Sequence, residues 1–394
     1  MNSAALRIVV SGYMAQYPLG GVAWDYLQFF LGLRRLGHDV YYVEDTGQWP
    51  YNPSEGGLAE DDCSFNVGYL ADLFSRFDAD DRWAYRFFWN DRWFGLSDAK
   101  RREVFATADL VVNVSGSIAD PEPHRNRAIW VYVDTDPVFT QIKLAKGNRN
   151  IQRQVDAHDV LYTIGETMSD QGVDDDRVWR PMRHPIVVSE WQTDRRPRAT
   201  FTTVMNWTSY KDVEYEGKVY GQKDVELKRL IELPSLVPAA GFELAVNEGK
   251  TRRLPRELLE HKGWRIVDPA IVCPDLDSYR DYIQGSFGEW SVAKGGYVAG
   301  RSGWFSGRSA AYLAAGRPVV VQDTGFSETL PVGEGILPFN TMAEASAGVE
   351  EVMADWNRHS IAAAEIAVEY FSSDTVLAAV VEHAMSASGG RPRS

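Results

Sequence analysis

Two aspartates that directly follow an apolar run are the residues of this sequence best placed to accept a proton. Asp134 and Asp136 end the segment IWVYVDTD, and Pro137 comes next. A partly desolvated carboxylate at the end of a strand can act as a general base toward an attacking hydroxyl. Asp136 can instead cap a helix that begins near Pro137, so Asp134 is the first candidate for the base. His184 and His124 are the next candidates.

A second group of residues is suited to binding an anion. The segment from Arg301 to Glu328 reads RSGWFSGRSAAYLAAGRPVVVQDTGFSE. Its Gly- and Ser-rich start precedes a helix, whose first N–H groups lack intrahelical partners and lie at the positive end of the helix dipole. The small neighbours of Arg301 and Arg308 leave room for bidentate contacts to a phosphate. We therefore expect Arg301, Ser306 and Arg308 to bind a diphosphate without a metal ion, although DTD at 134–136 has the spelling of a metal-binding triplet.

The same segment resembles the donor-binding core of GT-B glycosyltransferases, whose secondary-metabolite members carry an HCGWNS-type loop. Gly303, Trp304 and Ser306 keep the residue types of that loop, whereas Arg301 stands in place of the usual histidine and Phe305 in place of the usual asparagine. The glutamate pair of retaining members is missing. The resemblance implies a GT-B fold, in which two Rossmann-like domains with parallel sheets face each other across a cleft.

The resemblance also implies which half of the cleft binds which substrate. The acceptor is expected on the first domain and the donor on the second, where the Lys- and Tyr-rich loop at 210–223 usually faces the donor. The nucleotide-diphosphate sugar, taken to be a UDP-sugar, is a co-substrate, and no cofactor or metal is expected. The expected donor-binding residues are Arg301, Ser302, Gly303, Ser306, Arg308, Ser309, Asp323, Thr324, Gly325 and Lys223.

Two features of the first half indicate where an acceptor could bind. Gly20 and Gly21 open a helix after the first strand and allow a ligand to approach the backbone, and Asp25 follows in the first turns of that helix. The segment at 83–94 is unusually aromatic, and exposed aromatic patches mark binding surfaces. The structural alternatives are a turn before a helix, a carboxylate that complements the helix dipole, and packing in the domain core. The expected acceptor-binding residues are Gly20, Gly21, Asp25, Trp89 and Trp93.

The order of the apolar runs predicts two α/β domains. A strand, a helix and a second strand occupy the N-terminal segment, and a break rich in proline at 179–191 separates two alternating series. The terminal helices resemble those that cross back to the first domain in GT-B proteins, and packing on their own domain is equally compatible with the pattern. We divide the chain into an acceptor-binding domain at 1–188, a donor-binding domain at 189–360, a crossing helix at 361–385 and a disordered tail at 386–394.

Composition narrows the range of partners. The chain has 394 residues and a net charge of −14, without a long basic run. We therefore expect no nucleic-acid polymer as a partner, because binding its backbone needs a concentrated Lys/Arg face. No run approaches the roughly 20 apolar residues that span a bilayer, so we expect no stable membrane insertion and a cytoplasmic protein. We expect a monomer or a homodimer.

These observations predict an enzyme, a glycosyltransferase of the hexosyltransferase type. It would move a sugar to a hydroxyl of a small molecule, such as a natural product, a nucleoside or a saccharide, with inversion at the anomeric carbon. Asp134 would be the base, and Asp323 would contact the hydroxyls of the donor sugar. A sugar-nucleotide epimerase would fit the same fold, as would a non-catalytic sugar or nucleotide binder if Asp134 and Asp136 were only caps.

Overall fold

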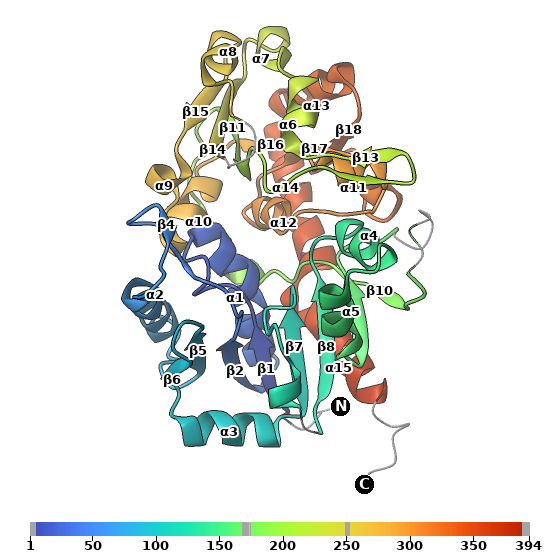
Figure 1. Cartoon of the computed structure of the whole chain (residues 1–394). Helices are drawn as coiled ribbons and strands as arrows, with labels where there is room; N and C mark the ends of the chain where they lie inside the picture. The colour runs from blue at the N-terminus through green and yellow to red at the C-terminus, as the bar shows by residue number, and fades with distance from the viewer. Residues whose placement is uncertain (1–4, 126, 168–172, 174, 249–252, 388–394) are drawn as a thin grey trace.

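Two parallel sheets, one in each half of the chain, organise the molecule as two lobes (Figure 1). The computed structural model describes residues 5–125, 127–167, 173, 175–248 and 253–387. The first sheet lies in the lobe built from the N-terminal half, and the second in the lobe built from the C-terminal half. The two-domain α/β arrangement expected from the sequence is therefore present.

The first sheet is parallel except at one edge, where β5 (Trp83–Phe87) and β6 (Arg92–Gly95) form an antiparallel hairpin. Its central strands are buried on both faces, which is why they read as continuous apolar runs in the sequence. The remaining helices of this half are α2 (Ser64–Ser75), α3 (Asp98–Thr107), α4 (Phe139–Ala145) and α5 (Arg149–Asp156). The strands, in their order across the sheet, are β10 (Trp179–Pro181), β9 (Val160–Thr163), β8 (Ile129–Asp134), β7 (Leu110–Val114), β1 (Arg7–Ser11), β2 (Asp39–Glu44), β5 (Trp83–Phe87) and β6 (Arg92–Gly95).

The second sheet is parallel throughout. Its strands, in order, are β15 (Arg265–Val267), β14 (Gly241–Asn247), β11 (Thr200–Asn206), β16 (Gly288–Ser291), β17 (Val319–Gln322) and β18 (Ile336–Phe339). Small antiparallel hairpins lie outside the sheets, β3 (Tyr51–Asn52) with β4 (Gly57–Leu58) and β12 (Val213–Tyr215) with β13 (Lys218–Tyr220). The helices of this half are α6 (Lys223–Lys228), α7 (Leu233–Leu236), α8 (Arg256–His261), α9 (Pro269–Val272), α10 (Leu276–Gln284), α11 (Gly295–Ala299), α12 (Gly307–Ala314) and α13 (Met342–Ala354).

The helix α1 (Gly20–Arg35) packs against both domains. It contacts β1 and β2 on its own side and α10 and α12 of the second domain on the other. Apolar side chains cover most of its circumference, as expected for a helix that is enclosed rather than exposed on one face. The indole N–H of Trp24 donates to the carbonyl oxygen of Leu276 at 2.8 Å, and its ring packs on that of Trp191. The interface between the domains is therefore part of the main hydrophobic core.

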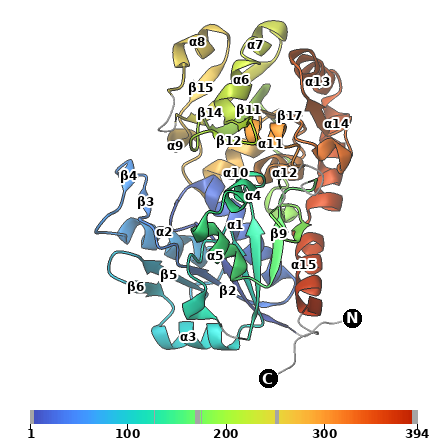
Figure 2. The same cartoon turned by 45° about the vertical axis from the view of Figure 1, so that its right-hand side comes forward.

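The C-terminal helices run from the second domain back to the first (Figure 2). Helix α14 (Trp356–Ile366) continues through a π-helical turn at Ala367–Phe371 into α15 (Ser373–Ala387), which packs on α1, β7 and β8. The backbone of Ile186 pairs with Phe371 and Ser373, so the segment that connects the domains and the returning chain are hydrogen-bonded together. The predicted boundary at residues 188 and 189 falls in this connecting segment, and most of the predicted tail lies outside the described residues.

The close approach of α1 to α10 requires glycine at the start of α1. A Cβ atom on Gly20 would lie 2.1 Å from the carbonyl oxygen of Asp275, and one on Gly21 would lie 2.8 Å from the Tyr279 ring. We predict that Gly20→Ala lowers the free energy of unfolding by about 1–3 kcal/mol, the usual cost of overpacking, in urea titration. Gly68→Ala is the matched control, because nothing lies within 4 Å of that position on α2. Equal stability of the two variants would contradict this account.

Candidate active site

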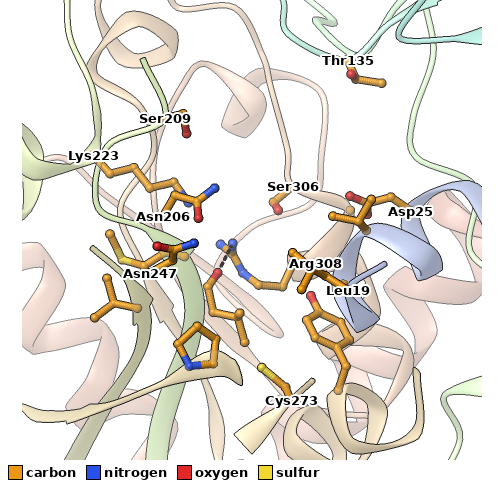
Figure 3. A pocket seen from close by; sticks show the side chains of 18 of the residues that line it. Leu19, Asp25, Thr135, Asn206, Ser209, Lys223, Asn247, Cys273, Ser306 and Arg308 are labelled. Carbon is orange, nitrogen blue, oxygen red and sulfur yellow. Dashed lines mark hydrogen bonds between the residues drawn. The ribbon is translucent and has the colours of Figure 1, made fainter. Parts of the chain in front are cut away.

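A cavity of about 730 Å³ lies between the two domains at the carboxyl ends of their strands. The first domain contributes residues that follow β1 and β8 and the last residue of β7, and the second contributes the ends of β11 and β14 and the segment after β15. Open parallel sheets bind ligands at this edge, and the volume is within the range of roughly 300–1,000 Å³ of small-molecule sites. Figure 3 shows Lys223, Asn206 and Asn247 on one side and Asp25 on the other, with Ser306 and Arg308 between them.

Helix α12 begins at this cavity. Ser306 is its N-cap residue and lines the cavity, but the Ser306 side chain caps no backbone N–H. The unpaired N–H groups of this first turn can therefore bind an anion. The first helical residue is Gly307, and a Cβ atom there would lie 3.0 Å from Nδ1 of His184 and 3.2 Å from Oδ1 of Asp25. His184 and Asp25 thus meet the start of α12 at one point of the cavity wall.

Arg308 lines the cavity and also links strands of the second sheet. Its Nε–H donates to Oε1 of Glu289 at 2.6 Å, and its two terminal nitrogens donate to the carbonyl oxygen of Val204 at 2.7 Å and to Oγ of Ser291 at 3.1 Å. Burial alone would lower the pKa of Arg308, but Glu289 raises it above the ordinary value. The sequence predicts a bidentate contact from Arg308 to a diphosphate, whereas three of its N–H groups already bind the protein.

Lys223, at the start of α6, lies near the same point of the cavity. Burial lowers the pKa of Lys223 well below its ordinary value, and the charges of Arg308 and Lys294 lower it further, against the opposing effect of Glu289. An anion that enters the cavity would relieve the repulsion among these cations and favour the charged lysine. This side of the cavity therefore suits an anion, and Lys223, Ser306 and Arg308 all line it, while their binding of a diphosphate stays a prediction.

Asp25 supplies a carboxylate beside the start of α12, on the side of the cavity away from Lys223. Its side chain is exposed to the cavity but lies deep in the molecule, and burial raises the pKa of Asp25 to about 7, with Arg308 acting in the opposite direction. Burial lowers the pKa of His184 to about 4, so this histidine is neutral at pH 7. A carboxylate with a pKa near neutrality has the property that a general base needs.

The two aspartates singled out in the sequence lie outside the cavity. Asp134 is buried and accepts hydrogen bonds from Thr140 Oγ1 at 2.7 Å, Gln141 Nε2 at 3.0 Å and Thr163 Oγ1 at 3.1 Å. It therefore holds the start of α4 instead of facing a substrate. Asp136 binds residues of the second domain. Among the described residues, no group of three His, Cys, Asp or Glu side chains could hold a metal ion.

Most of the predicted donor-binding loop also lies outside the cavity. Arg301 pairs with Glu328 on the surface, and Asp323 accepts hydrogen bonds from Gly325 and Ser327 in the turn after β17. The hydroxyl of Thr324 donates to the carbonyl oxygen of Trp304 at 2.6 Å. These bonds hold the loop to itself and to the first domain, where it also pairs with Gly165 and Thr167. The predicted donor-binding residues that do not line the cavity are Arg301, Ser302, Gly303, Ser309, Asp323, Thr324 and Gly325.

Of the predicted acceptor-binding residues, some line the cavity and others lie outside it. Gly21 and Asp25 line the cavity, whereas Gly20 packs on α10. The aromatic segment forms the β5–β6 hairpin, in which Trp89 is exposed and packs on Trp49, and Trp93 lies beneath Arg101. Neither tryptophan lines the cavity, because the hairpin is at the far edge of the sheet.

Several cavity residues were not predicted. Asn206 and Asn247 are the last residues of β11 and β14. Like Asp134, they lie at the carboxyl end of a parallel strand, where ligands usually bind. Lys294 follows β16 in the same way. Thr135 lies between the two aspartates of the DTD triplet, and its side chain faces the cavity where theirs do not.

Comparison with known proteins identifies solved structures of the same fold. No protein-family profile matches the chain, and no curated protein matches it in sequence. An alpha-glucosyltransferase in complex with UDP and a 13-mer DNA containing an HMU base is 11% identical, with a TM-score of 0.59 over 97% of this chain and 100% of that one. AviGT4, a glycosyltransferase involved in avilamycin A biosynthesis, is 12% identical, with a TM-score of 0.54 over 98% and 99%. Alr3699/HepE of Anabaena, in complex with UDP, is 11% identical, with a TM-score of 0.58 over 97% and 100%.

The chain therefore has the fold of GT-B glycosyltransferases. The predicted fold is confirmed, and the resemblance to nucleotide-sugar glycosyltransferases is confirmed at the level of the fold. No helix in the described part of the chain has both the length and the apolar character needed to cross a bilayer. The cytoplasmic location stays a prediction.

The prediction that excluded a nucleic-acid polymer as a partner is wrong. Several of the matched structures are alpha-glucosyltransferases in complex with DNA, so proteins of this fold accommodate such a partner. The net charge of −14 is a sum over the whole chain, whereas binding depends on the charges at the contacting surface.

The buried Arg308–Glu289 pair leads to a prediction about stability. Arg308→Met should lower the free energy of unfolding by about 3–5 kcal/mol, because it leaves Glu289 buried without its partner. Arg358→Met, which breaks exposed ion pairs with Glu334 and Glu351, should cost less than about 1 kcal/mol in the same urea titration. If the double variant Arg308→Met/Glu289→Met is no more stable than Arg308→Met alone, an unpaired buried charge is not the cause.

Proposed function

We propose that this chain is a glycosyltransferase that moves a sugar from a UDP-sugar to a hydroxyl of an acceptor. One observation carries the proposal: within a GT-B fold, Lys223 at the start of α6 and Arg308 in the first turn of α12 line the same cavity between the domains as the Asp25 carboxylate. The cations suit the diphosphate leaving group, and the carboxylate suits the proton of the attacking hydroxyl.

The donor would lie along the second domain. Asn206 and Asn247 at the strand ends offer hydrogen-bonding groups for the nucleoside, and Lys223 and the first turn of α12 would hold the diphosphate. UDP as the nucleotide is supported by several of the matched structures, which are complexes with UDP. We propose that the cations stabilise the leaving group without a divalent ion.

Replacement of Lys223 tests the donor site. Lys223→Met should weaken UDP binding by about 1.5–3 kcal/mol, the usual contribution of a charged hydrogen bond, in calorimetry with EDTA present. Lys218→Met, on the exposed part of β13, is the control and should bind UDP like the parent protein. Unchanged affinity in Lys223→Met would refute this placement, and UDP binding that requires Mg²⁺ would refute the metal-independent part.

The acceptor would lie along the first domain. Apart from Asp25, His184 and Thr135, that wall is mostly apolar. It suits a hydroxyl carried on an apolar or aromatic framework, such as that of a natural product or a nucleoside. Asp25 replaces Asp134 as the proposed base, and one carboxylate on the acceptor side is the arrangement that direct displacement with inversion requires. The apolar wall residues are Leu19, Val22, Tyr26, Phe29, Tyr51, Pro53 and Val114.

Asp25→Asn tests the base. The amide keeps the shape of the side chain but cannot take a proton, so kcat should fall by roughly 10²–10⁴-fold while UDP affinity is retained. In the parent protein, kcat/KM should rise with pH through about 7 and then level off, because Asp25 must be ionised to accept a proton. The titratable groups beside Asp25 are Arg308, His184 and Tyr279. Asp134→Asn is the control, which should cost stability but spare kcat in the folded protein.

The assay for these variants is acceptor-dependent release of UDP from UDP-glucose. The acceptors should include aryl glycosides, nucleosides and duplex DNA with hydroxymethyl bases, and the anomeric proton coupling of the product reports inversion or retention. A sugar-nucleotide epimerase would alter the donor without an acceptor. Full activity of Asp25→Asn would remove Asp25 from the mechanism.

A further inference from the structure

Asp136 is the centre of a hydrogen-bond cluster that joins the two domains. Its Oδ1 accepts from Lys294 Nζ at 2.8 Å and from the hydroxyl of Tyr297, and its Oδ2 accepts from the hydroxyl of Tyr210 at 2.7 Å. Asp136 belongs to the first domain, and its three partners belong to the second. Burial favours the neutral acid, yet Lys294 and the two hydroxyls hold the pKa of Asp136 below its ordinary value.

The ammonium of Lys294 lies in a cage formed by both domains. Nζ is 5.3 Å from the centre of the Phe139 ring, 4.6 Å from that of Tyr210 and 5.1 Å from that of Tyr297. It also donates to the Tyr210 hydroxyl at 3.0 Å. A cation held by aromatic faces and a carboxylate is fixed in position. Because Lys294 also lines the cavity, the cluster places a positive charge in the cavity wall.

The backbone beside Asp136 is strained and packed against the second domain. Val138 has φ 71°, a conformation that a β-branched residue rarely adopts. Its side chain contacts Gly300, and the Phe139 ring contacts Gly296, where a Cβ atom would lie only 2.3 Å away. Strain of this kind persists only where surrounding contacts impose it, and such sites concentrate where conformation matters for function. Here the Val138 N–H donates to Oε1 of Gln141 at 2.7 Å within the first domain, and the packing contacts on Gly296 and Gly300 come from the second domain.

We propose that Asp136 is a positioning residue that fastens the two domains in the closed form and fixes Lys294 at the cavity wall. The part of this inference that concerns turnover rests on the proposed function, whereas the part that concerns closure does not. Without the carboxylate, the strained segment at 136–138 relaxes, the cleft opens and Lys294 leaves the cage. Chemistry across the cleft then slows, because small displacements of reacting groups have large effects on rate.

Asp136→Asn tests the inference in the full-length protein without ligand. Small-angle X-ray scattering should show a larger radius of gyration than in the parent protein, and hydrogen exchange should become faster in residues 134–146. With UDP-glucose and an acceptor, kcat should fall by about 10–100-fold while the Kd for UDP stays within about twofold. A residue that acts only through stability would lower the melting temperature without this separation of kcat from Kd.

Further variants keep the test decisive. Tyr297→Phe removes only the hydrogen bond from the Tyr297 hydroxyl to Asp136. It should increase the radius of gyration and the hydrogen exchange, and lower kcat, by less than Asp136→Asn does. This variant replaces Asp136→Asn if that one does not fold. Asp136→Asn/Lys294→Met should be no more open than Asp136→Asn, because both changes remove the same ion pair. Glu328→Gln, which breaks the exposed pair with Arg301, should change nothing. Scattering and exchange identical to those of the parent protein would overturn the proposal, even if the chain proved to have another activity.

Discussion

The packing of a single helix against both domains is the interaction on which the rest of the structure depends. Helix α1 begins at the cavity, carries Asp25 into its wall and then runs between the first sheet and helices α10, α12 and α15. Interfaces between domains are usually polar and allow movement, whereas this one is continuous with the main core. The position of Asp25 relative to α12 is therefore determined by hydrophobic packing as well as by local hydrogen bonds.

The second determinant of the site is the distribution of buried charge. Arg308 is balanced by Glu289, and Lys294 is balanced by Asp136, but burial lowers the pKa of Lys223 well below its ordinary value, and Arg308 and Lys294 lower it further. A bound anion would favour the charged form of Lys223, because it would offset the repulsion from Arg308 and Lys294. Binding of a doubly charged ligand in such a site is more favourable in free energy than binding to a solvated cluster of lysines, because little water competes inside the site.

The sequence predicted the fold better than it predicted the site. Apolar runs marked nearly every central strand, because parallel strands are buried on both faces, whereas β5 and β6 were read only as an aromatic segment. Asp134 and Asp25 show why the residues of the site could not all be predicted from the sequence. Asp134 ends a strand and Asp25 lies in the helix that follows the first strand, but only the packing of α4 and α1 determines that Asp134 turns inward to Thr140 and Gln141 while Asp25 faces the cavity. Pairings between residues far apart in the chain, such as Arg308 with Glu289, leave no local signal.

The return of α15 to the first domain has a consequence for synthesis on the ribosome. The faces of α1, β7 and β8 that α15 covers stay open until the last helices have been made, although the rest of that domain is complete some 200 residues earlier in the chain. At about 5–20 residues per second, this interval lasts on the order of 10–40 s. During it the nascent chain presents an unfinished apolar surface, so the first domain depends for its final packing on the segment that is translated last.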